Sequence, residues 1–149
     1  MENINETNKI NILFICRANC FRSKVAEAYF KKINRNKNIK VKSAGIVYGY
    51  KQNDSQIKIA KEFGLNIRGI SKGISANLLK WTNILVDVAD DVPAEIFNYE
   101  ENKKGIKIIM WNIKDAPASD KKEIKRVIRE IMVKVEELNK DLELGRIKL

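Results

Sequence analysis

The chain has 149 residues, of which 44% are hydrophobic and 32% charged, and it carries a formal net charge of +10. This composition is typical of one globular domain, and no apolar run reaches the roughly 18 residues of a membrane span. The absence of histidine excludes Ser-His-Asp and Cys-His nucleophilic sites and His-bearing zinc sites, and two cysteines are too few for a Cys-only zinc site or a disulfide framework.

The start of the chain is polar. We expect a flexible segment at residues 1–8 and a folded domain at residues 9–149. The first segment lacks the apolar stretch of a secretory signal peptide, and together with the low cysteine content this predicts a cytoplasmic protein without membrane contact. Residues 1–80 carry 16 Lys and Arg against 5 Asp and Glu, a charge that would attract anionic ligands.

Two kinds of apolar spacing alternate along the chain. Short, nearly continuous runs are typical of buried parallel strands, and a period of 3.6 residues is typical of helices. In chain order they predict a strand at 9–16, a helix at 22–33, a strand at 39–43, helices at 54–63 and 75–80, a strand at 83–87, a helix at 93–99, a strand at 105–111 and a helix at 119–142. Alternating strands and helices predict an α/β fold, a single-domain, three-layer open sandwich with a four-stranded parallel sheet flanked by helices.

The last helix has a candidate N-cap. Ser119 is the expected cap, and Glu123 resembles the second member of a capping box. The spacing is one residue too long for that box.

The loop between the first strand and the first helix is the candidate site. It reads Cys16-Arg-Ala-Asn-Cys-Phe-Arg22-Ser23. A loop that enters a helix N-terminus turns backbone N–H groups towards one point, which makes an anion site and favours the thiolate of a cysteine there. Arg22 is suited to grip two phosphate oxygens and Ser23 to stabilise the thiolate, while Asn19 tolerates the left-handed conformation of tight loops. Taken alone, a cysteine such as Cys16 would more often be an inert buried thiol. The hypothesis that Cys16 is a nucleophile therefore depends on its position between a buried strand and a helix.

These residues resemble the low-molecular-weight protein tyrosine phosphatase family. The family has a Cys, an Asn three residues later, an Arg-Ser pair and an Ala-Glu pair, as at Cys16, Asn19, Arg22-Ser23 and Ala26-Glu27. Ser43-Ala-Gly45 and Trp111-Asn-Ile-Lys-Asp115 are similar to two further family segments. The resemblance covers about residues 9–142 and implies that residues 9–149 form a low-molecular-weight phosphatase-like domain.

The resemblance also implies an activity. Cys16 would attack phosphorus and become a cysteinyl phosphate, Arg22 would hold the phosphoryl group, and Asp115 would be the general acid and then the general base. Read alone, Asp115 is also a plausible turn or cap residue. The other expected substrate-binding residues are Arg17, Ala18, Asn19, Cys20, Phe21, Ser23 and Tyr48.

The expected partners follow from this chemistry. The substrate would be a phosphorylated protein, by default one with phosphotyrosine, or a small phosphate ester. Phosphate and vanadate would inhibit. Neither a cofactor nor a metal is implied, because the loop and Arg22 would neutralise the phosphate, and the oligomeric state stays open.

The sequence departs from the family pattern in the loop. Ala18 stands where the family usually has Gly, and a positive φ there would cost about 1–2 kcal/mol. Phe21 occupies the place of the family's second cysteine and Cys20 lies one position earlier, so a protective disulfide with Cys16 depends on the loop geometry. Lys24 replaces the usual Pro.

A second departure concerns the acid. Asp115 is followed by Ala116-Pro117, whereas the family has Pro and an aromatic residue, so one aromatic wall of the phosphotyrosine site is missing. Tyr48 and Tyr50 are candidates for the opposite wall.

Three rival functions remain. An arsenate reductase of this fold would need resolving cysteines beyond the loop, and none follows Cys20, although an external thiol could substitute. A non-catalytic phosphate-binding module would suit the changes at Ala18 and Phe21. Nucleic-acid binding is not expected, because the basic residues are scattered and match no recognised motif.

Overall fold

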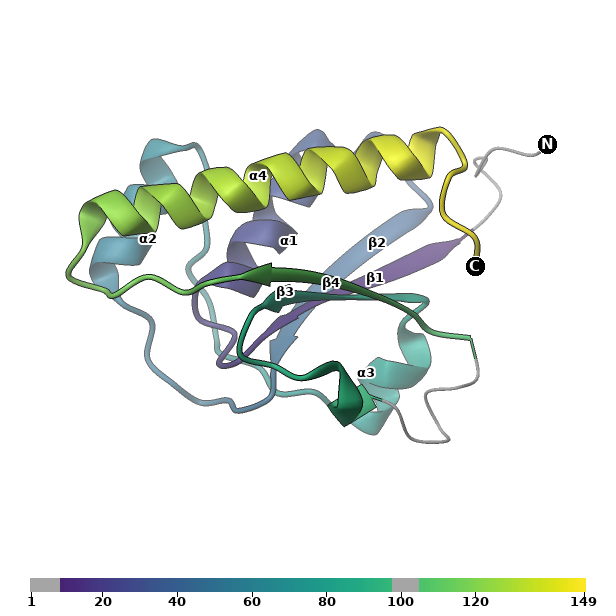
Figure 1. The fold of residues 1–149 in the computed structure, drawn as a ribbon, viewed down its shortest axis with the longest axis horizontal. Helices are drawn as coiled ribbons and strands as arrows, with labels where there is room; N and C mark the ends of the chain where they lie inside the picture. The colour runs from purple at the N-terminus through teal and green to yellow at the C-terminus, as the bar shows by residue number, and fades with distance from the viewer. Residues whose placement is uncertain (1–8, 98–104) are drawn as a thin grey trace.

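The computed structural model describes residues 9–97 and 105–149 and contains one four-stranded sheet between two layers of helices (Figure 1). Its elements are β1 (Ile10–Cys16), α1 (Arg22–Ile33), β2 (Ile39–Gly45), α2 (Asp54–Glu62), α3 (Ala76–Trp81), β3 (Ile84–Ala89), the 3-10 helix η1 (Ala94–Phe97), β4 (Lys107–Ile113) and α4 (Lys121–Glu143). The predicted α/β class and the parallel sheet are confirmed. The flexible segment expected at residues 1–8 lies outside the described residues.

The sheet has the order β2-β1-β3-β4, and every pair of neighbouring strands is parallel. From β1 the chain first crosses to β2 on one side and then returns to β3 on the other side. Such a reversal of strand order opens a crevice beyond the carboxyl ends of the strands, where α/β proteins bind ligands. Cys16, the last residue of β1, lies at this position and pairs with Gly45 at the end of β2.

The helices cover both faces of the sheet. In Figure 1, α1, α2 and α4 lie over one face and α3 lies on the other. Along the buried strand β1, Ile12 and Phe14 face the first layer while Leu13 and Ile15 face the second. Apolar residues at helical spacing give α4 one buried face: Ile124, Val127, Ile128, Ile131, Val135, Leu138 and Leu142. No helix within the two described ranges combines the length and apolarity needed to cross a bilayer.

Several element boundaries differ from the prediction. β3 continues past Asp87 to Ala89, although the polar Asp87 was expected to end the strand. The helix predicted at 93–99 is the single 3-10 turn η1, and residues 98–99 lie outside the described ones. The N-cap of α4 is Asp120, whose side chain accepts a hydrogen bond from the Glu123 N–H at 3.1 Å. Because the cap lies one residue beyond Ser119, Glu123 stands at the third helical position that a capping box requires.

Candidate active site

The loop between β1 and α1 contains one residue with a left-handed backbone. Asn19 has φ 54°, whereas Ala18 has no positive φ. Asn adopts this conformation more readily than most residues, because its short polar side chain can bond locally. The strain that a positive φ at Ala18 would cause is therefore absent.

The side chain of Asn19 fixes the loop to three neighbouring segments. Its amide nitrogen donates to the hydroxyl oxygens of Ser23 at 2.8 Å and Ser43 at 2.9 Å, and its oxygen accepts from the Lys72 N–H at 2.9 Å. Ser43 in turn donates to Glu27 at 2.5 Å. Since Asn19 is fully buried, this network holds the loop against α1, β2 and residues 66–72.

Gly45 allows the loop to approach β2 closely. A Cβ atom at this position would lie 2.7 Å from the Asn19 nitrogen, 2.7 Å from the Val47 oxygen and 2.8 Å from the Ala18 carbonyl carbon. All three are backbone atoms, so no side-chain rotation would relieve the overlap. The Ser-Ala-Gly sequence at the end of β2 thus supplies both the hydroxyl that Asn19 binds and the space that the loop occupies.

The carbonyl groups of the loop bond to residues around it. Hydrogen bonds join the carbonyl oxygens of Arg17, Ala18 and Cys20 to the Val47 N–H at 2.9 Å, the Ser71 hydroxyl at 2.6 Å and the Gln52 amide at 3.0 Å. In contrast, no backbone N–H group of residues 17–23 donates to another described residue. A loop with bonded carbonyls and free N–H groups at a helix N-terminus is an anion cradle.

Cys16 and Ser23 meet at the base of this cradle. The Cys16 sulfur lies 3.0 Å from the Ser23 hydroxyl oxygen, and only 3% of Cys16 is exposed. A thiolate has no proton to give, so Ser23 must donate when Cys16 is ionised. The structure therefore pairs the predicted nucleophile with a group that stabilises its charged form.

The second cysteine faces a different environment. The Cys20 sulfur lies near the carbonyl oxygens of Ala18 and Tyr50, at 3.5 and 3.8 Å, and both cysteines are free thiols. Burial raises the pKa of the Cys20 thiol. Cys20 therefore gives less thiolate at neutral pH than an exposed cysteine, and thiolate is the form that attacks a sulfenic acid or a disulfide.

Arg22 holds three loops together at the other end of the cradle. Only 3% exposed, its guanidinium donates to the Ile113 carbonyl at 2.9 Å, to Asp90 at 3.3 Å and to Asp91 at 3.0 Å. A carboxylate oxygen of Asp115 lies 3.6 Å from the same group. The structure thus brings the predicted acid Asp115 to the predicted phosphate ligand Arg22.

The remaining predicted residues have different positions. Asp115 follows β4 and is 54% exposed, so solvent and substrate can reach its carboxyl group. Arg17 is exposed, whereas the Phe21 side chain lies in the core and can face a ligand only through its backbone. Tyr48 is exposed, and its ring lies against Gly73. The preceding residue, Val47, donates its N–H to the Arg17 carbonyl, so Tyr48 directly follows a residue that is bonded to the loop.

Sequence reasoning missed the carboxylates that surround Arg22. Asp90 and Asp91 follow β3 directly, at the same edge of the sheet as Cys16. Polar residues after a parallel strand are a general indication of a ligand site, and applied to β3 this rule would have found them.

Asp87 is a buried carboxyl group on the same strand. Its Oδ1 accepts the Ala89 N–H at 3.2 Å, and its Oδ2 has no hydrogen-bond partner among the described residues. The pKa of Asp87 is raised to about 7, chiefly by burial; the Asp91 charge adds to the rise, while the Ala89 N–H and the Arg22 charge oppose it. At neutral pH this group is therefore close to its titration midpoint.

Asp87→Asn should remove one pH-dependent part of the stability. The folded-state pKa of about 7 exceeds the ordinary value of 3.8, so the folded protein keeps a proton that the unfolded chain has released. The stability of the wild type should therefore fall as pH rises through this window. The difference in free energy of unfolding between Asp87→Asn and wild type should shift in favour of the variant by roughly 2–4 kcal/mol from pH 4 to pH 8. Urea unfolding at both pH values measures this difference. The exposed Asp54→Asn is the control, and parallel curves for Asp87→Asn and wild type would contradict the assignment.

Comparisons with known proteins agree with this geometry. The family model described as Low molecular weight phosphotyrosine protein phosphatase matches residues 11–146. An arsenate reductase from Staphylococcus aureus (strain Newman) is 32% identical over 130 residues, which cover 86% of this chain and 95% of that protein. A solved protein tyrosine phosphatase from Entamoeba histolytica, 25% identical, has a TM-score of 0.80 and covers 93% of this chain and 100% of its own. The YwlE arginine phosphatase from Geobacillus stearothermophilus shares the fold, with a TM-score of 0.76 at 20% identity over 92% of this chain and 95% of its own.

Proposed function

Because the chain belongs to the low molecular weight phosphotyrosine protein phosphatase family, we propose that it hydrolyses phosphomonoesters through a cysteinyl-phosphate intermediate. The observation that carries this proposal is the cradle itself. In it, the Cys16 sulfur lies 3.0 Å from the Ser23 hydroxyl, below a loop whose backbone N–H groups have no partner among the described residues. Such a loop binds three phosphate oxygens and places phosphorus over the sulfur.

Two steps follow from the arrangement. In the first, the Cys16 thiolate attacks phosphorus, the bond to the leaving oxygen breaks, and Asp115 gives that oxygen a proton. In the second, Asp115 takes a proton from water, the water oxygen attacks phosphorus, and the sulfur leaves as a thiolate that Ser23 stabilises. Arg22 would hold two phosphoryl oxygens by exchanging part of its carboxylate contacts for the substrate.

We propose protein phosphotyrosine as the substrate class. Tyr48 and Tyr50 are exposed and belong to a segment that contacts the loop, through the Val47 N–H bonded to the Arg17 carbonyl and the Tyr50 carbonyl 3.8 Å from the Cys20 sulfur. One of these rings would form a wall against one face of an aromatic substrate group. No second aromatic residue follows Asp115, so this wall would be one-sided.

Arsenate reduction is the second candidate, because the curated relative from Staphylococcus aureus is an arsenate reductase. The same cradle would accept arsenate, which has the shape and charge of phosphate. The chain holds only two cysteines, and the Cys20 thiol faces the Ala18 and Tyr50 carbonyls, so an external thiol would have to supply the electrons.

One assay separates these activities. Purified protein should hydrolyse p-nitrophenyl phosphate between about pH 5 and pH 8 without added metal, and vanadate should block the reaction. In parallel, arsenate is offered with glutathione and with thioredoxin and its reductase, and arsenite is measured. Arsenite formation without ester hydrolysis would replace the phosphatase by the reductase. Vanadate binding without either reaction would leave a non-catalytic phosphate-binding module.

A further inference from the structure

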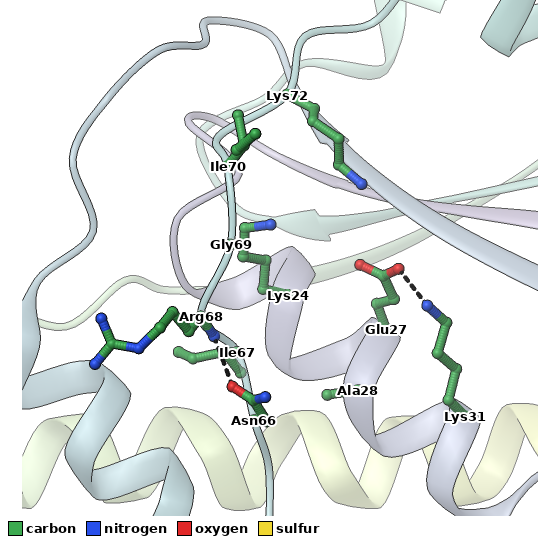
Figure 2. Close-up of a pocket in the computed structure, with 10 residues that line it drawn as sticks. All are labelled: Lys24, Glu27, Ala28, Lys31, Asn66, Ile67, Arg68, Gly69, Ile70 and Lys72. Carbon is green, nitrogen blue, oxygen red and sulfur yellow. Dashed lines mark hydrogen bonds and ion pairs between the residues drawn. The ribbon is translucent and has the colours of Figure 1, made fainter.

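A second pocket lies beside the catalytic loop, between α1 and residues 66–72 (Figure 2). It encloses about 490 Å³. Four of its residues occupy one face of α1 at helical spacing: Lys24, Glu27, Ala28 and Lys31. The proposed reaction uses none of the side chains that line it.

Lys24 is a buried cation without a described partner. The residue is 7% exposed, and its ammonium group forms no hydrogen bond or ion pair with any residue in the described ranges. Gly69 leaves space for it, since a Cβ atom there would lie only 3.3 Å from the Lys24 nitrogen. Burial and the neighbouring charge of Lys72 lower the pKa of Lys24. The side chain is largely buried, but its ammonium nitrogen still reaches solvent, so an anion in the pocket can approach it.

Lys72 supplies a second charge to the same space. Figure 2 shows the Lys24 and Lys72 side chains entering the gap between α1 and residues 66–72. Lys72 has no ion pair within the described part of the chain. Repulsion between the two ammonium groups would be relieved by an anion between them.

The one acidic residue that lines the pocket is already engaged. Glu27 accepts from Lys31 at 2.8 Å and from Ser43 at 2.5 Å. Burial alone would raise the pKa of Glu27, but the hydrogen bonds from Lys31 and Ser43, together with the charges of Lys31 and Lys72, lower it. The hydrogen bonds of Glu27 therefore go to Lys31 and Ser43, and its charge offsets those of Lys24 and Lys72 only through space, without an ion pair.

We propose that this pocket is a second anion-binding site, distinct from the catalytic loop, in which Lys24 and Lys72 hold a doubly charged group of the phosphate or dicarboxylate type. The pocket has room for such a group, and the buried Ile67 and the half-buried Ala28 give it an apolar wall. The anion is either free in solution or part of an acidic substrate segment. Binding in the pocket does not depend on the proposed phosphatase activity.

NMR titration with inorganic phosphate at constant ionic strength tests the site. Amide resonances of residues 66–69 should shift with their own saturation curve, separate from that of residues 17–23. Lys24→Met and Lys72→Met should each weaken the first curve at least tenfold, whereas the exposed Lys58→Met, which removes the same charge from α2, should change it less than twofold. Lys72 is exposed, so its variant keeps the test valid if Lys24→Met does not fold.

The outcomes are distinct. Shifts confined to residues 17–23, or equal weakening by Lys58→Met, would overturn the second site. Shifts confined to residues 66–69 would support the anion site in the pocket. They would contradict phosphate binding by residues 17–23, and with it the proposed function.

A second experiment identifies the source of the anion. It compares the affinities of Cys16→Ser protein for two phosphotyrosine peptides, in which the phosphotyrosine is flanked by glutamates in one and by glutamines in the other. This arm rests on the proposed function. At least fivefold tighter binding of the glutamate peptide, lost in Lys72→Met, would assign the pocket to an acidic substrate segment. Equal binding of the two peptides, with phosphate still bound in the pocket, would assign it to a free anion.

Discussion

Replacing Cys16 with serine should lower the turnover of p-nitrophenyl phosphate by roughly 10³-fold or more, because a serine hydroxyl is far less nucleophilic than a thiolate. Phosphate and vanadate should still bind, because the N–H groups of residues 17–23 and the Arg22 side chain remain in place. Steady-state kinetics and calorimetric titration with phosphate measure the two properties on the same protein.

The control for this prediction is the other thiol. Cys20→Ser should lose far less activity, since the Cys20 sulfur lies near the Ala18 and Tyr50 carbonyls and has no proposed part in the reaction. Equal losses in the two variants would indicate a damaged loop, and retained turnover in Cys16→Ser would exclude the cysteinyl-phosphate mechanism.

Asp115→Asn should have an effect that depends on the leaving group. A poor leaving group needs a proton as its bond to phosphorus breaks, so kcat/KM for phenyl phosphate or phosphotyrosine should fall roughly 10²- to 10³-fold. p-Nitrophenolate leaves without help, and its ester should lose less than about tenfold. The measurement is kcat/KM across a series of aryl phosphates. This value should depend more steeply on the pKa of the leaving phenol in Asp115→Asn than in the wild type.

Asp90→Asn is the matched control for the acid. Asp90 also contacts Arg22, at 3.3 Å, but has no proposed part in proton transfer. Its substitution should affect all esters alike. If Asp115→Asn showed that same uniform loss, Asp115 would be a partner of Arg22 and not the general acid.

The parts of the site that lie close together in the sequence could be predicted. The apolar run of β1, the loop and the helical spacing of α1 are contiguous, so the position of Cys16 between a strand and a helix was correct. The family resemblance added Asp115, and the structure places it 3.6 Å from Arg22. No pattern of spacing alone would have paired residues so far apart in the chain.

Other features depend on contacts between distant segments. The tolerance of Asn19 for a left-handed backbone could be predicted, and its φ is positive, but the contacts of its side chain with β2 and residues 66–72 cannot be inferred from the loop sequence. The strand β3 continues through Asp87 because its neighbours bury it, whereas the sequence shows only a polar residue. These features depend on contacts and burial between segments distant in the sequence, which local sequence patterns do not predict.

The contacts of Arg22 connect phosphate binding with acid placement. One guanidinium joins the start of α1 to the loop after β3, which carries Asp90 and Asp91, and to the loop after β4, which carries Asp115. A substitution at Arg22 would remove the proposed phosphate ligand and also a contact of the proposed acid, so a further substitution at Asp115 would add less to the loss of activity. The effects of the two residues on the reaction barrier are therefore coupled, and the free energies measured one at a time will add to more than the loss in the double mutant.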